Sequence, residues 1–269
     1  MRSTEQNSRY GHLDRMTARE LLDGINSEDM GVAESVSKAV PQIETLVNGI
    51  VERMKKGGRV FYIGAGTSGR LGIIDASEIP PTYGARDRFI GLIAGGDVAV
   101  RNAVEGAEDD IVQGWKDLLP FHPDSNDTLI GITTSGVTPY VIAVIKEARS
   151  HGLLTGCITC NEGSPVAEAA ECPVVTVTGP EFVTGSTRMK AGTATKMVLN
   201  MISTSVMILL GHVKGCKMVD MELTNAKLVD RGTRMIMEET GITDYDKAKA
   251  LLLRHGHVRQ AVEAYTEGE

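Results

Sequence analysis

Residues 62–84 read YIGAGTSGRLGIIDASEIPPTYG, and this stretch decides the fold. It opens at the end of a short apolar run rich in β-branched and aromatic residues, which predicts a buried parallel strand. Gly64, Gly66 and Gly69 follow with the GxGxxG spacing of a phosphate-binding turn, and residues 67–78 have a helical pattern. A strand, a glycine-rich turn and a helix in this order predict the first unit of a doubly wound α/β fold.

The same alternation continues along the chain. Four further apolar runs predict strands at residues 89–96, 127–136, 154–161 and 173–178. The intervening segments predict helices at residues 97–118, 138–152 and 164–171, and a long buried helix at residues 185–213. Such regular alternation predicts an α/β protein with a doubly wound, parallel, five-stranded sheet.

The flanking regions predict helices without strands. Residues 1–56 combine an irregular start with two helical patterns, and residues 221–269 predict a short C-terminal helical module, expected to be truncated. The sheet domain is expected to span residues 57–220.

Composition excludes several classes of partner. The net charge is −7 and aromatic residues make up only 4% of the chain, so a basic, base-stacking surface for nucleic acid is not expected. The longest apolar run, Met197–Gly211, is shorter than the roughly 20 residues of a membrane span. The polar start of the chain lacks the apolar region of a signal peptide, so a cytoplasmic protein with no membrane partner is expected.

The cysteines and histidines do not suggest a metal centre. Cys157 and Cys160 form a C-x-x-C motif, but they lie in a strand pattern and no second cysteine pair completes a zinc site. We interpret them as small buried residues and expect no metal and no cofactor.

The glycine-rich turn fits neither common nucleotide motif. The dinucleotide motif requires an acidic residue about 20 residues further on, and Asp97 lies too far along the chain. The P-loop requires a Gly-Lys-Ser/Thr sequence, which is missing after this turn.

Hydroxyl clusters in three loops give a stronger signal. They are Thr67 and Ser68; Thr133, Thr134, Ser135 and Thr138; and Thr184, Ser186 and Thr187. Parallel strands end at one edge of the sheet, so we expect these loops to form one site for a phosphate monoester from hydroxyl groups and helix N-termini. The alternative is that each hydroxyl only caps its helix. Arg188 and Lys190 are either further anion ligands or members of structural ion pairs.

Three long motifs resemble one known family. They are YIGAGTSGRLGIIDASEIPPTYG, GLIAGGDVAVRNAVEGAEDD and GPEFVTGSTRMKAGTATK, and the resemblance runs from about Ser3 to about Asp230. The chain resembles the N-acetylmuramic acid 6-phosphate etherases, which have the sugar isomerase (SIS) fold and are related to the glucokinase regulatory protein. The resemblance implies removal of D-lactate from N-acetylmuramic acid 6-phosphate without metal or nucleotide. It also implies that Glu78 is the general acid and Glu108 the second catalytic glutamate.

The residues themselves support these roles unequally. Glu78 falls at the carboxyl end of its predicted helix, where the helix dipole disfavours a negative charge, as suits an acid. Without the resemblance, a solvent-facing glutamate is the simpler interpretation. Glu105 and Glu108 look like one acidic helix face, so the residues alone leave the choice between them open.

Two alternatives and one question of assembly remain open from the sequence. A sugar-phosphate-binding regulator or an aldose–ketose isomerase would use the same phosphate loops. A continuous helix from Ser68 would carry Glu78 roughly 15 Å away from the phosphate, at 1.5 Å per residue. Therefore either this helix breaks near Gly72, or Glu78 serves the site of a second subunit in a homodimer with shared active sites.

Overall fold

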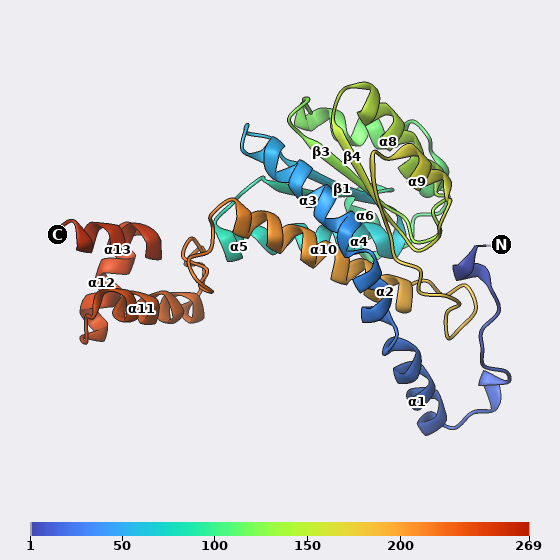
Figure 1. Ribbon diagram of the computed structural model, residues 1–269, viewed down its shortest axis with the longest axis horizontal. Coiled ribbons are helices and arrows are strands. Elements are labelled where there is room, and N and C mark those ends of the chain that lie inside the picture. Colours follow the sequence, from blue (N-terminus) through green and yellow to red (C-terminus); the bar gives the residue numbers. More distant parts are fainter. Residues whose placement is uncertain (1, 269) are drawn as a thin grey trace. The chain divides into compact units, whose positions relative to one another are not determined.

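The computed structural model describes residues 2–268 and contains two compact units (Figure 1). The first comprises the residues up to Ala76 together with Phe89–Thr204, and the second comprises Ser77–Arg88 together with the residues from Ser205 onward. The sequence-based domain boundaries at residues 57 and 220 stay a prediction.

A five-stranded, all-parallel sheet forms the centre of the first unit, in the order β2-β1-β3-β4-β5. The strands are β1 (Val60–Gly64), β2 (Phe89–Ile93), β3 (Thr128–Ile132), β4 (Leu154–Thr159) and β5 (Cys172–Val175). All five predicted strands are therefore present, and the predicted α/β class is confirmed.

Helices cover both faces of this sheet (Figure 1). One face buries Phe61 and Ile63 against α7 (Gln113–Leu118), α8 (Pro139–Ser150) and α9 (Pro165–Ala169). The opposite face packs α4 (Gly66–Ser77) closely against the sheet, because Gly72 lies next to Tyr62 and Gly91 lies next to Ile73. α3 (Val40–Met54) also packs against the sheet, at β4 and β5. The long helix α10 (Lys190–Leu209) follows β5 in the chain.

The predicted long helix at residues 97–118 is wrong. The chain instead forms α6 (Gly96–Arg101), a 3₁₀ turn η3 (Ala107–Asp109) and α7. Gly106 adopts a φ of +72°, which cannot continue a right-handed helix. The Asp110 carboxylate then accepts hydrogen bonds from the N–H groups of Val112 and Gln113, where a new helix begins.

The predicted N-terminal helices are present with an additional break. They are α1 (Ala18–Asp29), α2 (Val32–Lys38) and α3, preceded by the 3₁₀ turns η1 (Ser3–Glu5) and η2 (Leu13–Arg15). Thr17 and Glu20 form a capping box at the start of α1. Pro41 follows the α2–α3 junction at Ala39, since a proline is accepted in the first turn of a helix but not in its interior.

The second unit contains a small three-helix core. α11 (Ala226–Thr240), α12 (Tyr245–His255) and α13 (Val258–Thr266) bury Ile236, Leu252 and Val258 together. Arg259 forms an ion pair with Asp220 at 2.7 Å, which ties α13 to the segment after α10. Residues 210–225 are not helical, so the helical module predicted at residues 221–269 begins only at α11.

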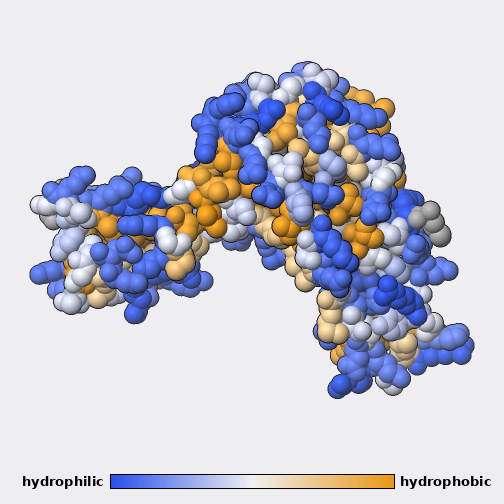
Figure 2. Space-filling view, in the orientation of Figure 1, coloured by the Kyte–Doolittle hydropathy of each residue, from blue (hydrophilic) through white to orange (hydrophobic). Residues whose placement is uncertain are grey.

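Apolar residues reach the surface of the second unit near the carboxyl end of α10. Ile208 and Leu209 are 47% and 53% exposed. Figure 2 shows apolar residues gathered where this end of α10 and the short helix α5 (Ile79–Tyr83) lie in Figure 1. Within residues 2–268, no helix is long and apolar enough to cross a membrane.

Candidate active site

The candidate site lies at the carboxyl edge of the sheet in the first unit. Gly64 at the end of β1 pairs with Ile132 at the end of β3, so the loops that follow these two strands start side by side. β1 also has β2 on its other side, and the chain order reverses between β1 and β3. This is the position at which open α/β sheets bind their ligands.

A cavity of about 360 Å³ opens at this edge. Its wall includes Gly66 at the start of α4 and the segment from Asn102 to Glu108. Glu105 and Glu108 both line it, and both side chains are exposed. The structure thus brings two acidic side chains to the start of α4. They flank the turn at Gly106 and do not lie on one helix face.

Arg70 holds the acidic wall in place. Its Nε donates to the carbonyl of Val100 at 2.9 Å, and its Nη2 lies 3.4 Å from the carbonyl of Asn102. Arg70 also lines the cavity. Arg70 therefore joins α4 to the residues that precede Glu105 and Glu108 in the chain.

The first predicted phosphate loop forms the start of α4. Ser68 is 8% exposed and Thr67 is half-buried. The N–H groups in the first turn of an α-helix have no partner within the helix, and they favour an anion. A Cβ at Gly69 would lie 2.8 Å from the Gly64 carbonyl oxygen, so only glycine allows the helix to start this close to the strand.

The second predicted loop is a compact hydroxyl cluster after β3. The Thr133 hydroxyl lies 2.8 Å from the Thr138 hydroxyl and 3.2 Å from that of Ser135. Gly136 turns the chain with a φ of +76°, and a Cβ there would lie 2.3 Å from the Ser164 Cβ. The loop therefore needs glycine for its conformation and for its contact with the loop after β4.

The third predicted loop reaches the edge from further away. β5 ends at Val175, and Ser186 and Thr187 lie in the long irregular segment that joins β5 to α10. A Cβ at Gly192, in the first turn of α10, would lie 3.5 Å from the Thr187 carbonyl oxygen and 3.8 Å from Thr67. The first and third loops therefore meet at the start of α10.

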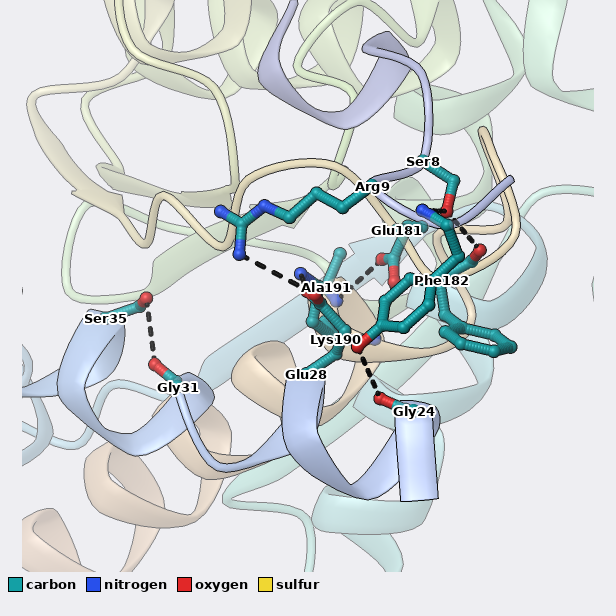
Figure 3. Close-up of polar contacts among 11 residues, drawn as sticks. Ser8, Arg9, Gly24, Glu28, Gly31, Ser35, Glu181, Phe182, Lys190 and Ala191 are labelled. Atoms are coloured by element: carbon teal, nitrogen blue, oxygen red, sulfur yellow. Dashed lines mark hydrogen bonds and ion pairs between the residues drawn. The ribbon is translucent and has the colours of Figure 1, made fainter. Parts of the chain in front are cut away.

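Lys190 forms a structural ion pair, which is one of the two roles that the sequence left open for it. Its ammonium group forms an ion pair with Glu28, and the two side chains are only 4% and 8% exposed. Arg9 adds a second cation 3.6 Å from the same carboxylate (Figure 3). Arg188, in contrast, is exposed.

The start of α10 carries a carboxylate cap that the sequence did not reveal. The two oxygens of Glu181 accept hydrogen bonds from the N–H groups of Lys190 and Ala191, both at 2.9 Å (Figure 3). Burial raises the pKa of Glu181, and these hydrogen bonds oppose that rise. The carboxyl group of Glu181 therefore already occupies the first N–H groups of α10.

Glu78 belongs to the second unit, where it is the residue between α4 and α5. Its backbone has φ −87° and ψ −10°, and its side chain is exposed. α4 runs without interruption to Ser77, so the helix break near Gly72, one of the two alternatives from the sequence, is absent.

The cysteines have the properties of core residues. Cys157 and Cys160 are buried free thiols, and burial raises their pKa values to about 12 and about 11. Such thiols are poor nucleophiles and poor metal ligands at neutral pH. In the part of the chain that the structure describes, no group of three or more histidine, cysteine or acidic side chains could hold a metal ion.

Relatives at high identity cover nearly the whole chain. A Bacteroides thetaiotaomicron protein is 61% identical over 263 residues, which are 97% of this chain and 95% of the relative. A Porphyromonas gingivalis protein is 60% identical over 262 residues, 97% of this chain and 95% of the relative. A Geobacillus protein is 50% identical over 262 residues, 97% and 89% of the two chains. Each relative is named N-acetylmuramic acid 6-phosphate etherase.

Family models and solved structures agree on the fold. The glucokinase regulatory protein N-terminal SIS domain matches residues 42–149, and the SIS domain matches residues 117–205. A protein from E. coli CFT073 is similar with a TM-score of 0.54 at 16% identity, covering 74% of this chain and 96% of that chain. A putative sugar-phosphate isomerase from Listeria monocytogenes gives a TM-score of 0.52 at 18% identity, covering 74% and 94%. At these identities the likeness establishes the SIS fold.

Proposed function

The chain belongs to the N-acetylmuramic acid 6-phosphate etherase family, and we propose that it removes the D-lactyl group from N-acetylmuramic acid 6-phosphate as D-lactate. The observation that carries the proposal is the cavity at the start of α4, which is lined by Gly66, Arg70, Glu105 and Glu108. It places two carboxylates beside the start of α4, and the N-terminus of a helix favours a phosphate. The second product is N-acetylglucosamine 6-phosphate, and the pathway is cytoplasmic recycling of peptidoglycan.

The phosphate is held by hydroxyl and N–H groups in this proposal. Ser68, Ser135 and Thr138 bind the 6-phosphate, and Thr67, Ser186 and Thr187 border the site. Support comes from the paired ends of β1 and β3 and from the contacts around Gly192. Arg188 is the cation best suited to an anionic substrate, because it is exposed whereas Lys190 is already paired with Glu28. Lys190 supports the site by fixing the start of α10 against α1.

The reaction that we propose is an elimination followed by addition of water. In the ring-opened sugar, the aldehyde at carbon 1 acidifies the hydrogen on carbon 2. Glu108 takes this proton, and the bond between carbon 3 and the ether oxygen breaks as Glu78 protonates that oxygen. D-Lactate leaves with its hydroxyl restored, and an α,β-unsaturated aldehyde remains.

Water completes the reaction. Its oxygen adds to carbon 3, a proton returns to carbon 2, and the acid that was deprotonated in the first step recovers its proton. The sum is one ether and one water converted to two alcohols. One carboxylate and one carboxylic acid are sufficient, so no redox step or metal is required by the proposed chemistry.

The experiment is incubation of the protein with N-acetylmuramic acid 6-phosphate and with the same sugar lacking phosphate. The proposal predicts D-lactate and N-acetylglucosamine 6-phosphate from the first sugar and slow or no turnover of the second. A ketose product would instead identify an aldose–ketose isomerase. Tight binding without any product would identify a sugar-phosphate-binding regulator.

A further inference from the structure

The N-terminal turn η1 is fastened to the hydroxyl loop after β3 through one buried side chain. Asn161 follows β4 and is 3% exposed, and Thr4 is fully buried. The Asn161 Nδ2 lies 3.0 Å from the Thr4 hydroxyl and 2.9 Å from the Thr134 carbonyl oxygen. The Asn161 amide therefore joins η1 at the start of the chain to the loop after β3, which lies more than a hundred residues further along.

The other atom of the same amide also faces the N-terminal turn. Its Oδ1 accepts from the Ser3 hydroxyl at 3.0 Å and from the Thr4 N–H at 3.4 Å. The donors of the amide thus face carbonyl and hydroxyl oxygens, while its acceptor faces an N–H and a hydroxyl. If the amide were flipped, its oxygen would face the Thr134 carbonyl oxygen and the hydrogen bond would be lost. The hydrogen-bond partners therefore favour the observed amide orientation.

The hydrogen bond from Asn161 to the Thr134 carbonyl fixes the direction of the Ser135 N–H group. In a trans peptide the carbonyl and the following N–H point in opposite directions. Because Asn161 and the Cys160 N–H both hold the Thr134 carbonyl, the N–H of Ser135 is directed away from them. The Asn161 Nδ2 also lies 3.4 Å from the Ser135 carbonyl, which restrains the next peptide in the same way.

The N-terminal segment also reaches the third loop. A Cβ at Gly185 would lie 3.8 Å from the Glu5 carboxylate, and the Thr184 hydroxyl accepts from the Ser8 N–H at 2.9 Å. Further along, the Ser8 hydroxyl donates to the Phe182 carbonyl at 2.7 Å (Figure 3). The segment therefore spans the second and third hydroxyl loops at the carboxyl edge of the sheet.

We propose that Asn161 is a positioning residue for the substrate phosphate, and that Ser3 and Thr4 support this role because they hold the Asn161 amide. This inference rests on the proposed role of the loop at residues 133–138 as a phosphate ligand. Asn161 does not contact the substrate. It fixes the peptide that presents the Ser135 N–H and hydroxyl, and the N-terminal turn fixes Asn161.

The test uses Asn161→Asp, which keeps the shape of the side chain and replaces the donor with an oxygen. We expect the KM for the phosphorylated sugar and the inhibition constant of inorganic phosphate to rise together by about 10-fold or more, corresponding to about 1.4 kcal/mol. The change in kcat should be smaller than the change in KM. Acidification should partly restore phosphate binding, because a protonated carboxyl can again donate to Thr134.

Two further variants separate positioning from general support. Thr4→Val removes the hydroxyl that Asn161 contacts and should raise both constants in the same direction. Ser8→Ala loosens the same segment at Phe182 and should leave both constants near the wild-type values. Thermal unfolding without ligand gives the stability of each variant, and a merely structural role would lower the Tm without changing the inhibition constant of phosphate.

The outcomes distinguish this inference from the function on which it rests. If Ser135→Ala raises the inhibition constant of phosphate and a folded Asn161→Asp does not, the positioning role is wrong and the phosphate loop stands. If neither variant changes phosphate inhibition, the proposed phosphate loop is wrong and the inference fails with it.

Discussion

Gly72 packs directly against Tyr62 without interrupting helix α4: a Cβ on this glycine would lie 3.0 Å from the Tyr62 Cβ. The helix continues from Gly66 to Ser77, and its 12 residues correspond to a length of about 18 Å. The glycine thus serves close packing on the sheet, not a bend. An unbroken helix separates the proposed phosphate loop at Ser68 from Glu78 along the chain.

The unbroken helix supports a shared active site in a homodimer. The phosphate and carbon 3 of a hexose 6-phosphate are much closer together than the ends of this helix, so we propose that Glu78 serves the phosphate site of a second subunit. The apolar residues at the end of α10 are the kind of surface that a partner subunit covers. A two-fold dimer would contain two equivalent composite sites.

Complementation tests this assembly. Glu78→Gln and the double variant Ser135→Ala/Thr138→Ala are each expected to be inactive. After random subunit exchange, half of the dimers are mixed and each has one intact site, so about a quarter of the wild-type activity should return. Mixed dimers without activity would place Glu78 in the site of its own subunit.

The conformation of Gly136 gives a prediction for phosphate binding. Gly136→Ala should raise the KM for the phosphorylated sugar and lower the stability by about 1–3 kcal/mol, because the new Cβ meets Ser164 at a positive φ. Gly163→Ala is the matched control, since Gly163 also has a positive φ, +58°, but nothing lies within 4 Å of its Cβ position. Equal KM values in the two variants would contradict a role for the contact with Ser164.

Asp75 predicts a pH dependence of stability. Burial raises its pKa above the ordinary value of 3.8, although Asn200 and Ser203 donate hydrogen bonds to it. The native state then binds this proton more tightly than the unfolded state, so the contribution to stability is present at low pH and is lost as the pH rises through the raised pKa.

Asp75→Asn isolates this contribution. Relative to the wild type, the variant should become more stable as the pH increases from about 4 to 7, by about 1.4 kcal/mol for each unit by which the pKa is raised. Urea unfolding at several pH values measures the difference. A difference between the two proteins that does not change with pH would show that Asp75 titrates normally.

Thiol labelling tests the interpretation of the C-x-x-C motif. In the native protein, Cys216 should react rapidly with a thiol reagent because it is exposed, and Cys172 should react more slowly. Cys157 and Cys160 should react only after unfolding, because both are buried and their pKa values are raised. Rapid labelling of either residue in the native protein would reopen a redox or metal-binding role.

The sequence predicted those features that depend on local patterns. Apolar runs bounded by glycine-rich turns identified all five strands, and the helix predicted at residues 138–152 is present as α8. The prediction of one helix at residues 97–118 was wrong although the apolar spacing there is helical. Gly106 interrupts the helix with its positive φ, and Asp110 caps the start of a new one.

Long-range contacts could not be predicted in this way. The ion pair between Lys190 and Glu28 and the amide of Asn161 join residues that are far apart in the chain, and neither leaves a local pattern. The irregular N-terminal segment also gave no sign from periodicity that it would reach the hydroxyl loops.

Substitution distinguishes Glu105 from Glu108 as the second catalytic glutamate. Both side chains line the same cavity and both are exposed, so each is a matched control for the other. Glu108→Gln should lower lactate release by about 10²–10⁴-fold, as expected for loss of a general base, and Glu105→Gln should have a much smaller effect.

Exchange of the hydrogen on carbon 2 in deuterated water tests the two-glutamate mechanism most directly. Glu78→Gln should incorporate deuterium at carbon 2 of N-acetylmuramic acid 6-phosphate while releasing almost no lactate, because the base is intact and the acid is missing. Glu108→Gln should show neither exchange nor lactate. Exchange in Glu108→Gln together with its loss in Glu78→Gln would reverse the two roles, and exchange in both variants would contradict the assignment of Glu108 as the base.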